Sequence, residues 1–121
     1  MLLDEALRAE VECRLLTRGR ITGLPREITI WFAADPGADR LFLLSGGREQ
    51  AHWVRNLAAN PRVTVRIRDR SFEATARVIA ADEDDDRVAR DALAAKYGTK
   101  WLTRWLRESL PVEIRVEREA G

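Results

Sequence analysis

An arginine-rich turn is the part of this sequence best suited to chemistry. Residues 17–26 read TRGRITGLPR, with three arginines, two glycines and two threonines. Glycine lets backbone N–H groups approach an anion, threonine adds a hydroxyl donor, and an arginine fork can grip a phosphate through two hydrogen bonds. Arg20 stands between two glycines with little core to fill, so we expect its loss to weaken binding and not folding. The alternative interpretation is a hairpin turn with solvated bases.

Two further segments could hold part of a ligand. Residues 44–48 (LSGGR) leave a buried strand and enter a helix, where backbone amides could bind an anion or the polar edge of a flat ring. The alternative is an ordinary strand-to-helix turn. Residues 52–57 (HWVRNL) place Trp53 either in the core or on the floor of a ring-binding cleft.

The common catalytic patterns are absent from the sequence. It contains no GxSxG, no phosphate-binding Walker loop, no HExxH and no CxxC, and His52 is its only histidine. The acidic run 82–86 is typical of a solvated helix start. We therefore expect no metal site, and if the protein is an enzyme we expect a cofactor to supply the difficult chemistry.

Composition excludes several classes of protein. With 121 residues, 45% apolar and 34% charged, the chain has the size and composition of one globular domain spanning 1–121. No apolar run approaches the roughly 18 residues of a membrane-spanning helix, and residues 1–13 do not resemble a secretory signal. The single Cys13 excludes an internal disulfide and fits a reducing compartment, so we expect a cytoplasmic protein.

Charge is concentrated in the middle of the chain. Residues 14–70 hold eleven bases and five acids, a net charge of +6, although the whole chain is only +1. The pI near 8.0 is too low to indicate nucleic-acid binding, for which values above about 9 are usual. We therefore expect no nucleic-acid partner, although arginine forks in this stretch suit phosphates and carboxylates.

The hydrophobic patterns predict a mainly β, α+β fold. Strict alternation and turn signals predict about six strands, mostly linked as hairpins, with three or four peripheral helices. A six-stranded antiparallel split barrel fits better than a parallel sheet, because closure removes exposed edges. The first predicted strand ends at 15–17, and the other five span 27–34, 40–45, 62–68, 72–80 and 112–116. We expect strand 27–34 to be central in the sheet and paired with strand 40–45. Two of the predicted helices span 4–13 and 50–59, and a third begins near 82. A fourth begins at Thr99 and places Trp101, Leu102 and Trp105 on one face.

Taken together and in order, these motifs resemble the deazaflavin-dependent nitroreductase family. The most specific pieces are Gly19-Arg20-x-x-Gly23-x-Pro25-Arg26 and Trp53-x-x-Asn56-Leu57-x-x-Asn60-Pro61. The resemblance covers roughly residues 15–98. It implies a split barrel related to pyridoxamine 5′-phosphate oxidases, which binds reduced coenzyme F420 and passes its hydride to a quinone, nitro compound or activated alkene.

The same resemblance implies where the coenzyme binds. The turn would hold the coenzyme phosphate and the start of its acidic tail, and the ring would lie along the strand end near the helix that carries Trp53. The implied cofactor-binding residues are Arg20, Ile21, Thr22, Gly23, Leu24, Pro25, Arg26, Leu44, Ser45, Gly46, Gly47, Arg48, Trp53 and Asn56. The alternatives are an FMN-binding oxidoreductase on the same barrel and a non-catalytic F420-binding or storage protein.

Two departures from the family leave the acceptor open. Ile21 occupies a position that is often basic, and Tyr97 is the only tyrosine where nitroreductases carry several near the C-terminus. Tyr97 could donate a proton, although packing at a helix end is the better interpretation. Trp101 and Trp105 could line an acceptor pocket or pack in the core. Trp31 lies on the apparent outer face of its strand, and an exposed aromatic side chain among apolar neighbours indicates an interface. Because proteins of the family that this sequence resembles are commonly dimers, we expect a homodimer.

Overall fold

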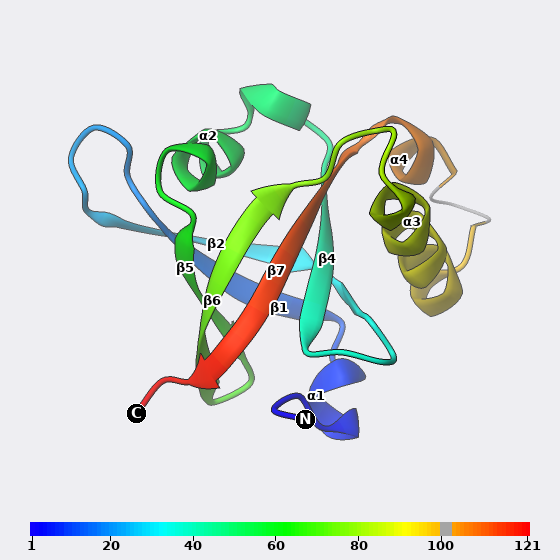
Figure 1. The fold of residues 1–121 in the computed structure, drawn as a ribbon, viewed down its shortest axis with the longest axis horizontal. Coiled ribbons are helices and arrows are strands. Elements are labelled where there is room, and N and C mark those ends of the chain that lie inside the picture. Colours follow the sequence, from blue (N-terminus) through cyan, green and yellow to red (C-terminus); the bar gives the residue numbers. More distant parts are fainter. Residues whose placement is uncertain (100–102) are drawn as a thin grey trace.

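One curled antiparallel sheet carries the fold of this computed structural model, which describes residues 1–99 and 103–121. Within these residues seven strands lie in the order β2-β1-β5-β6-β7-β4-β3, and every neighbouring pair is antiparallel (Figure 1). This confirms the predicted split-barrel class, with seven strands in place of six. The strands span Glu12–Arg18 (β1), Pro25–Trp31 (β2), Ala33–Ala34 (β3), Arg40–Ser45 (β4), Arg62–Ile67 (β5), Arg70–Val78 (β6) and Leu110–Glu119 (β7).

The first hairpin differs from the prediction. A helix was expected over 4–13, but α1 spans only Glu5–Arg8, and β1 begins at Glu12. From Glu12 onward buried and exposed side chains alternate, and all seven residues of β1 pair with β2. Val11, whose spacing suggested a helix face, is 54% exposed. Cross-strand pairing therefore outweighs the local helical spacing.

The expected central strand 27–34 is split and lies at the edge. β2 pairs with β1 alone, while only Ala33–Ala34 pairs with β4. The break falls at Phe32, whose N–H donates to the Tyr97 hydroxyl (3.1 Å) and whose carbonyl accepts from it (2.6 Å). The hairpin predicted between 27–34 and 40–45 is thus wrong for most of its length, because a side chain from a distant helix takes the backbone groups of Phe32.

The later elements follow the predictions more closely. β5 and β6 form the expected second hairpin, with Val63, Val65 and Ile67 buried. The helices are α2 (His52–Ala59) after a short 3₁₀ turn η1 (Arg48–Gln50), α3 (Asp84–Tyr97) and α4 (Thr103–Glu108). The predicted helix residues Trp101 and Leu102, like Lys100, lie outside the described residues.

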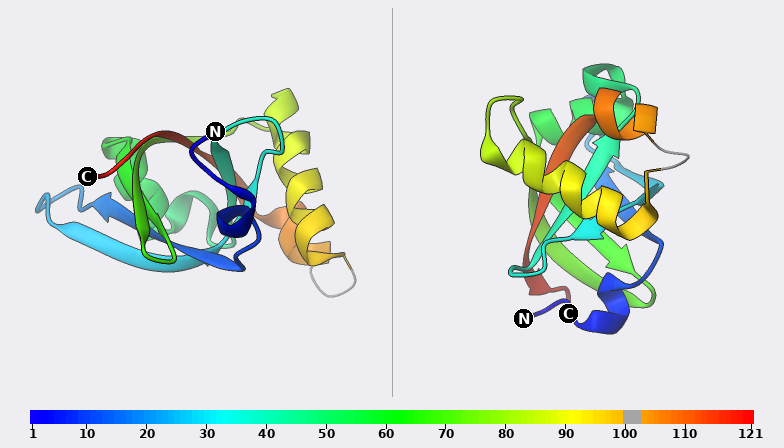
Figure 2. Two further views of the ribbon diagram at one scale, coloured as in Figure 1. Left: turned by 90° about the horizontal axis from the view of Figure 1, so that it is seen from below. Right: turned by 90° about the vertical axis from the view of Figure 1, so that its right-hand side faces the viewer.

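Two apolar clusters separate the helices into two roles. The larger cluster fills the inside of the curled sheet and includes Leu15, Phe72 and, from α2, Leu57. The smaller one joins β3 and β4 to α3 and α4 through residues such as Phe42 and Leu93. In Figures 1 and 2, α3 and α4 cover one side of the sheet, whereas α2 lies near the protruding β1–β2 hairpin. No helix of the described segments is long and apolar enough to cross a membrane.

Candidate functional site

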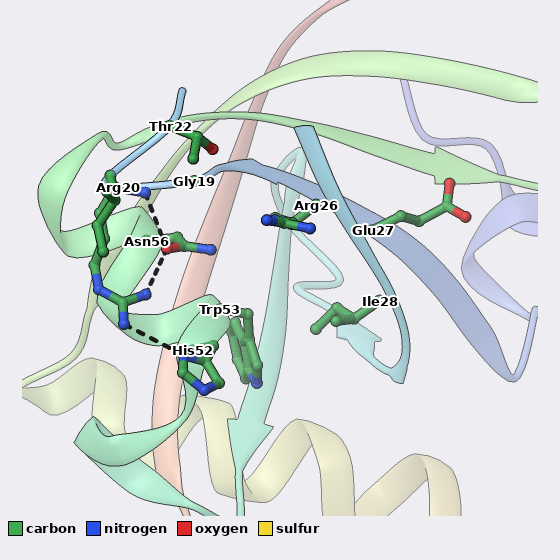
Figure 3. Close-up of a pocket in the computed structure, with 10 residues that line it drawn as sticks. Gly19, Arg20, Thr22, Arg26, Glu27, Ile28, His52, Trp53 and Asn56 are labelled. Carbon is green, nitrogen blue, oxygen red and sulfur yellow. Dashed lines mark hydrogen bonds between the residues drawn. The ribbon is translucent and has the colours of Figure 1, made fainter. Parts of the chain in front are cut away.

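A cavity of about 560 Å³ opens between the β1–β2 hairpin and α2. It brings together the two sequence motifs, which lie about thirty residues apart in the chain. Figure 3 shows Arg26 and Ile28 pointing from β2 toward Asn56 and Trp53 on α2, while Glu27 points away. The cavity is lined by Gly19, Arg20, Ile21, Thr22, Arg26, Glu27, Ile28, His52, Trp53 and Asn56.

Glycine shapes the turn that forms one wall. The Gly19 N–H donates to the Leu24 carbonyl (2.8 Å), and the Gly23 N–H donates to the Gly19 carbonyl (2.8 Å). A Cβ on Gly19 would lie 3.1 Å from Thr22 Oγ1 and 3.3 Å from the Leu24 oxygen, so a larger residue would crowd the turn. Gly23 has a φ of +73°, a conformation that side chains disfavour. The turn therefore needs both glycines to present its arginines.

Arg20 is tied to α2 by a polar network. Its backbone N–H and its Nη1 both donate to Asn56 Oδ1, at 3.2 and 2.9 Å, and its Nη2 lies 3.3 Å from His52 Nδ1 (Figure 3). Asn56 Nδ2 donates to Thr17 Oγ1 at 3.3 Å. Asn56 and Thr17 are only 4% and 2% exposed. Arg20 is itself half-buried and bridges the turn and α2, so we expect its loss to affect folding as well as binding.

Arg26 presents a second, less encumbered cation. It is exposed, lies opposite Thr17 in the register of β1 and β2, and faces the cavity. Within residues 1–99 and 103–121 its side chain forms no hydrogen bond or ion pair. Two guanidinium groups in a cavity flanked by the apolar side chains of Ile28 on β2 and Trp53 on α2 suit a flat molecule that carries an anionic group. These residues fit the phosphate and ring of a flavin-like coenzyme.

The structure brings only part of the predicted site to this cavity. Of the predicted cofactor-binding residues, those that line the cavity are Arg20, Ile21, Thr22, Arg26, Trp53 and Asn56. Gly23, Leu24 and Pro25 lie on the same loop but outside the cavity wall. Trp53 is half-buried and packs against the larger core cluster as well as lining the cavity, and its role in binding a ring stays a prediction.

The segment 44–48 lies apart from the cavity. Leu44 and Ser45 are 2% exposed, and Ser45 Oγ donates to the Arg48 carbonyl (3.0 Å). Arg48 has a φ of +53° and donates from Nη1 to the Glu108 carbonyl (2.6 Å). Gly46 and Gly47 are exposed. The turn is thus oriented toward the end of α4, and its role in ring binding stays a prediction.

Sequence reasoning missed several lining residues. Ile28 was predicted only as part of the strand 27–34. His52 was identified as the single histidine of the chain, but no role was assigned to it. Thr17 does not line the cavity, but its buried hydroxyl bonds to the lining residue Asn56, a contact that its place in the turn motif did not predict. The period-two pattern that puts Thr17, Arg26 and Ile28 on one face of a paired hairpin was the available signal, once β1 was known to pair with β2.

Tyr97 lies at the far end of β2, away from the cavity-lining residues. Its hydroxyl is held by the backbone of Phe32, and burial raises its pKa to about 12. Its ring also contacts Trp31 and Trp105. Trp105 is half-buried and packs on the smaller cluster. This geometry favours the packing role of Tyr97. Trp101, the other candidate for an acceptor pocket, lies outside the described residues.

A family model described as F420H2-dependent quinone reductase matches residues 7–118. The chain belongs to this family. It is an F420-dependent oxidoreductase, and coenzyme F420 is its cofactor. The resemblance inferred from the two motifs is therefore confirmed. Among the described residues no group of three or more possible metal ligands is found.

Solved structures of the same fold share little sequence with this reductase. HutZ, a heme storage protein from Vibrio cholerae, superimposes with a TM-score of 0.75 at 20% identity, covering 100% of this chain and 93% of HutZ. The conserved hypothetical protein Rv2991 from Mycobacterium tuberculosis gives 0.74 at 20% identity, covering 96% and 82%. An F420-H2 dependent reductase, FDR-A, gives 0.68 at 22% identity, covering 89% and 95%. At these identities the likeness establishes the fold alone.

Proposed function

We propose that the cavity between the β1–β2 hairpin and α2 binds reduced F420 and that the protein passes its hydride to a quinone. The observation that carries this proposal is that Arg20 and Arg26 converge on one cavity, in which Ile28 on β2 and Trp53 on α2 lie on facing walls. The arginines would hold the coenzyme phosphate. The apolar wall would lie along the ring.

The protein contributes binding and orientation to this reaction. When bound, F420 supplies the hydride, so the chain needs no nucleophile of its own. Arg20 and Arg26 fix one end of the ligand, and Trp53 limits how the ring can turn. Holding two reactants in line can lower a barrier by several kcal/mol, on the order of 7–11 in favourable cases.

A quinone is the acceptor class that we favour over nitro compounds and activated alkenes. The description of the family names a quinone, and a flat apolar acceptor can stack on a ring held against Trp53 and Ile28. Tyr97 is not needed as a proton donor, because solvent reaches the open cavity.

We further propose that the protein forms a homodimer. β2 is an edge strand of the sheet, and Trp31 on it is 39% exposed. A neighbour with 22% identity and a TM-score of 0.68 is described as a domain-swapped dimer, which is a property of that protein. Sedimentation at micromolar concentration tests the proposal, and a single species near 14 kDa would contradict it.

Two titrations and a turnover assay test the proposed reaction. We expect F420 to quench Trp fluorescence with a micromolar or lower Kd and FMN to bind at least tenfold more weakly. Oxidation of reduced F420 should then be followed with a quinone, a nitroimidazole and an activated alkene in parallel. Tight F420 binding without turnover of any acceptor would indicate a storage protein, and tighter binding of FMN would contradict the coenzyme site.

A further inference from the structure

The amide of Asn56 has only one orientation that satisfies its neighbours. The Arg20 N–H and the Arg20 Nη1 can only donate, so the atom they share must be the Asn56 oxygen. The Asn56 nitrogen then faces Thr17 Oγ1, which accepts from it. All three residues come from different elements: β1, the turn and α2. The Arg20 donors therefore select the orientation of the amide, and the buried Thr17 hydroxyl holds the amide in it by accepting from its nitrogen.

This network leaves Arg20 able to bind an anion. A guanidinium carries five N–H donors, and Arg20 spends one on Asn56 and one on His52, when His52 Nδ1 carries no proton. Three donors remain. A free arginine must lose rotamer freedom when it binds, whereas one already held in place loses less. Holding Arg20 in advance should therefore strengthen anion binding.

We infer that Thr17 and Asn56 are positioning residues that present Arg20 to the anionic group of the coenzyme. This inference rests on the proposed function of the cavity and adds to it. Thr17 lies behind the cavity wall and acts through Asn56. The cost of ordering one rotamer-rich side chain corresponds to about a 2- to 12-fold change in affinity, which is the effect expected when the Thr17 hydroxyl is removed.

A double-mutant cycle separates positioning from a general structural role. F420 affinity is titrated by Trp fluorescence for wild type, Thr17→Val, Arg20→Ala and the double variant, together with thermal melts. Thr17→Val keeps the shape of the side chain and removes the hydroxyl, and Thr17→Ser is the matched control that keeps it. We expect Thr17→Val to weaken binding about 2- to 12-fold, Thr17→Ser to bind within twofold of wild type, and Thr17→Val to have no further effect in the Arg20→Ala background.

Each other outcome overturns the inference in a recognisable way. Equal weakening by Thr17→Val in both backgrounds would mean that Thr17 acts on the fold and not through Arg20. If Thr17→Val did not weaken F420 binding in the wild-type background, Asn56 would hold Arg20 in place without the Thr17 hydroxyl. If Arg20→Ala and Arg26→Ala both left F420 affinity unchanged, the proposed site itself would be misplaced. Thr17→Ala replaces Thr17→Val in the same cycle if the latter melts below the assay temperature.

Discussion

Trp31 stacks on Tyr97 with ring centroids 4.6 Å apart and planes inclined by 17°. The pair joins the edge strand β2 to the C-terminal end of α3, at the point where the Tyr97 hydroxyl also takes the backbone N–H and carbonyl of Phe32. One tyrosine thus ends β2 and fixes α3 against the sheet. This arrangement accounts for the split of the strand and gives Tyr97 a structural task distinct from proton transfer.

The first prediction concerns the Tyr97 hydroxyl. Tyr97→Phe should lower the free energy of unfolding by about 1 kcal/mol, because the backbone groups of Phe32 lose a partner in a half-buried position. Oxidation of reduced F420 with a quinone should stay within twofold of wild type. Urea unfolding and steady-state turnover check the two halves. A large fall in kcat with unchanged stability would instead assign Tyr97 the role of proton donor.

The second prediction concerns the aromatic wall of the cavity. Trp53→Leu should weaken F420 binding about 2- to 12-fold, because aromatic contacts contribute roughly 0.5–1.5 kcal/mol beyond the area they bury. Trp31→Leu is the control, since Trp31 stacks on Tyr97 and does not line the cavity. Competition with a labelled ligand measures both affinities. Equal effects of the two variants would place the ring elsewhere.

The sequence was most informative where its signals are local. The turn around Arg20 was predicted correctly because glycines and a proline at fixed spacing specify a tight hairpin on their own. The convergence of this turn with α2 followed only from resemblance, since nothing in either motif states which elements lie between them. The polar link from Asn56 to Thr17 spans 39 residues and has no local signature.

The failures of prediction share one cause. The strand predicted over 27–34 is divided at Phe32, because the Tyr97 hydroxyl, 65 residues away, bonds to the Phe32 backbone. In the same way, a helix was predicted over 4–13, yet pairing with β2 extends β1 back to Glu12. The positions at which these strands begin and end were decided by tertiary contacts that short sequence patterns do not encode.

The third prediction concerns the half-buried ammonium of Lys96. Its Nζ donates to the Arg8 carbonyl (3.0 Å) and lies 3.8 Å from the centre of the Phe32 ring. Burial lowers its pKa from 10.5 to about 8, so between pH 8 and 10.5 the unfolded chain holds the proton that the folded protein has lost. The Lys96 contribution to the free energy of unfolding therefore rises with pH in that window.

A pair of stability profiles measures this effect. Between pH 7 and 9.5 wild type should gain about 1 kcal/mol relative to Lys96→Met, a figure reduced for the partial exposure of the side chain. Comparing the two proteins removes the contributions that both share, such as that of Tyr97, whose raised pKa has the opposite effect on the free energy of unfolding above pH 10. Parallel profiles for the two proteins would contradict the lowered pKa.

The last prediction compares two arginines on opposite faces of the same hairpin. Arg26 faces the cavity without a partner among the described residues, whereas Arg18, opposite Pro25, lines a different depression on the outer face. A hydrogen bond to a charged group contributes roughly 1.5–3 kcal/mol, so Arg26→Ala should weaken F420 binding about ten- to a hundredfold. Because the Arg26 side chain is exposed, the free energy of unfolding should change by no more than about 0.5 kcal/mol. Arg18→Ala should leave the F420 affinity within twofold of wild type and the free energy of unfolding within about 0.5 kcal/mol of it.

Titrations at two salt concentrations and thermal melts provide the measurements. The loss of affinity in Arg26→Ala should shrink at high salt because the lost contact is ionic. Equal weakening by both variants would show that the hairpin attracts the coenzyme through its overall charge and not through a specific contact at Arg26.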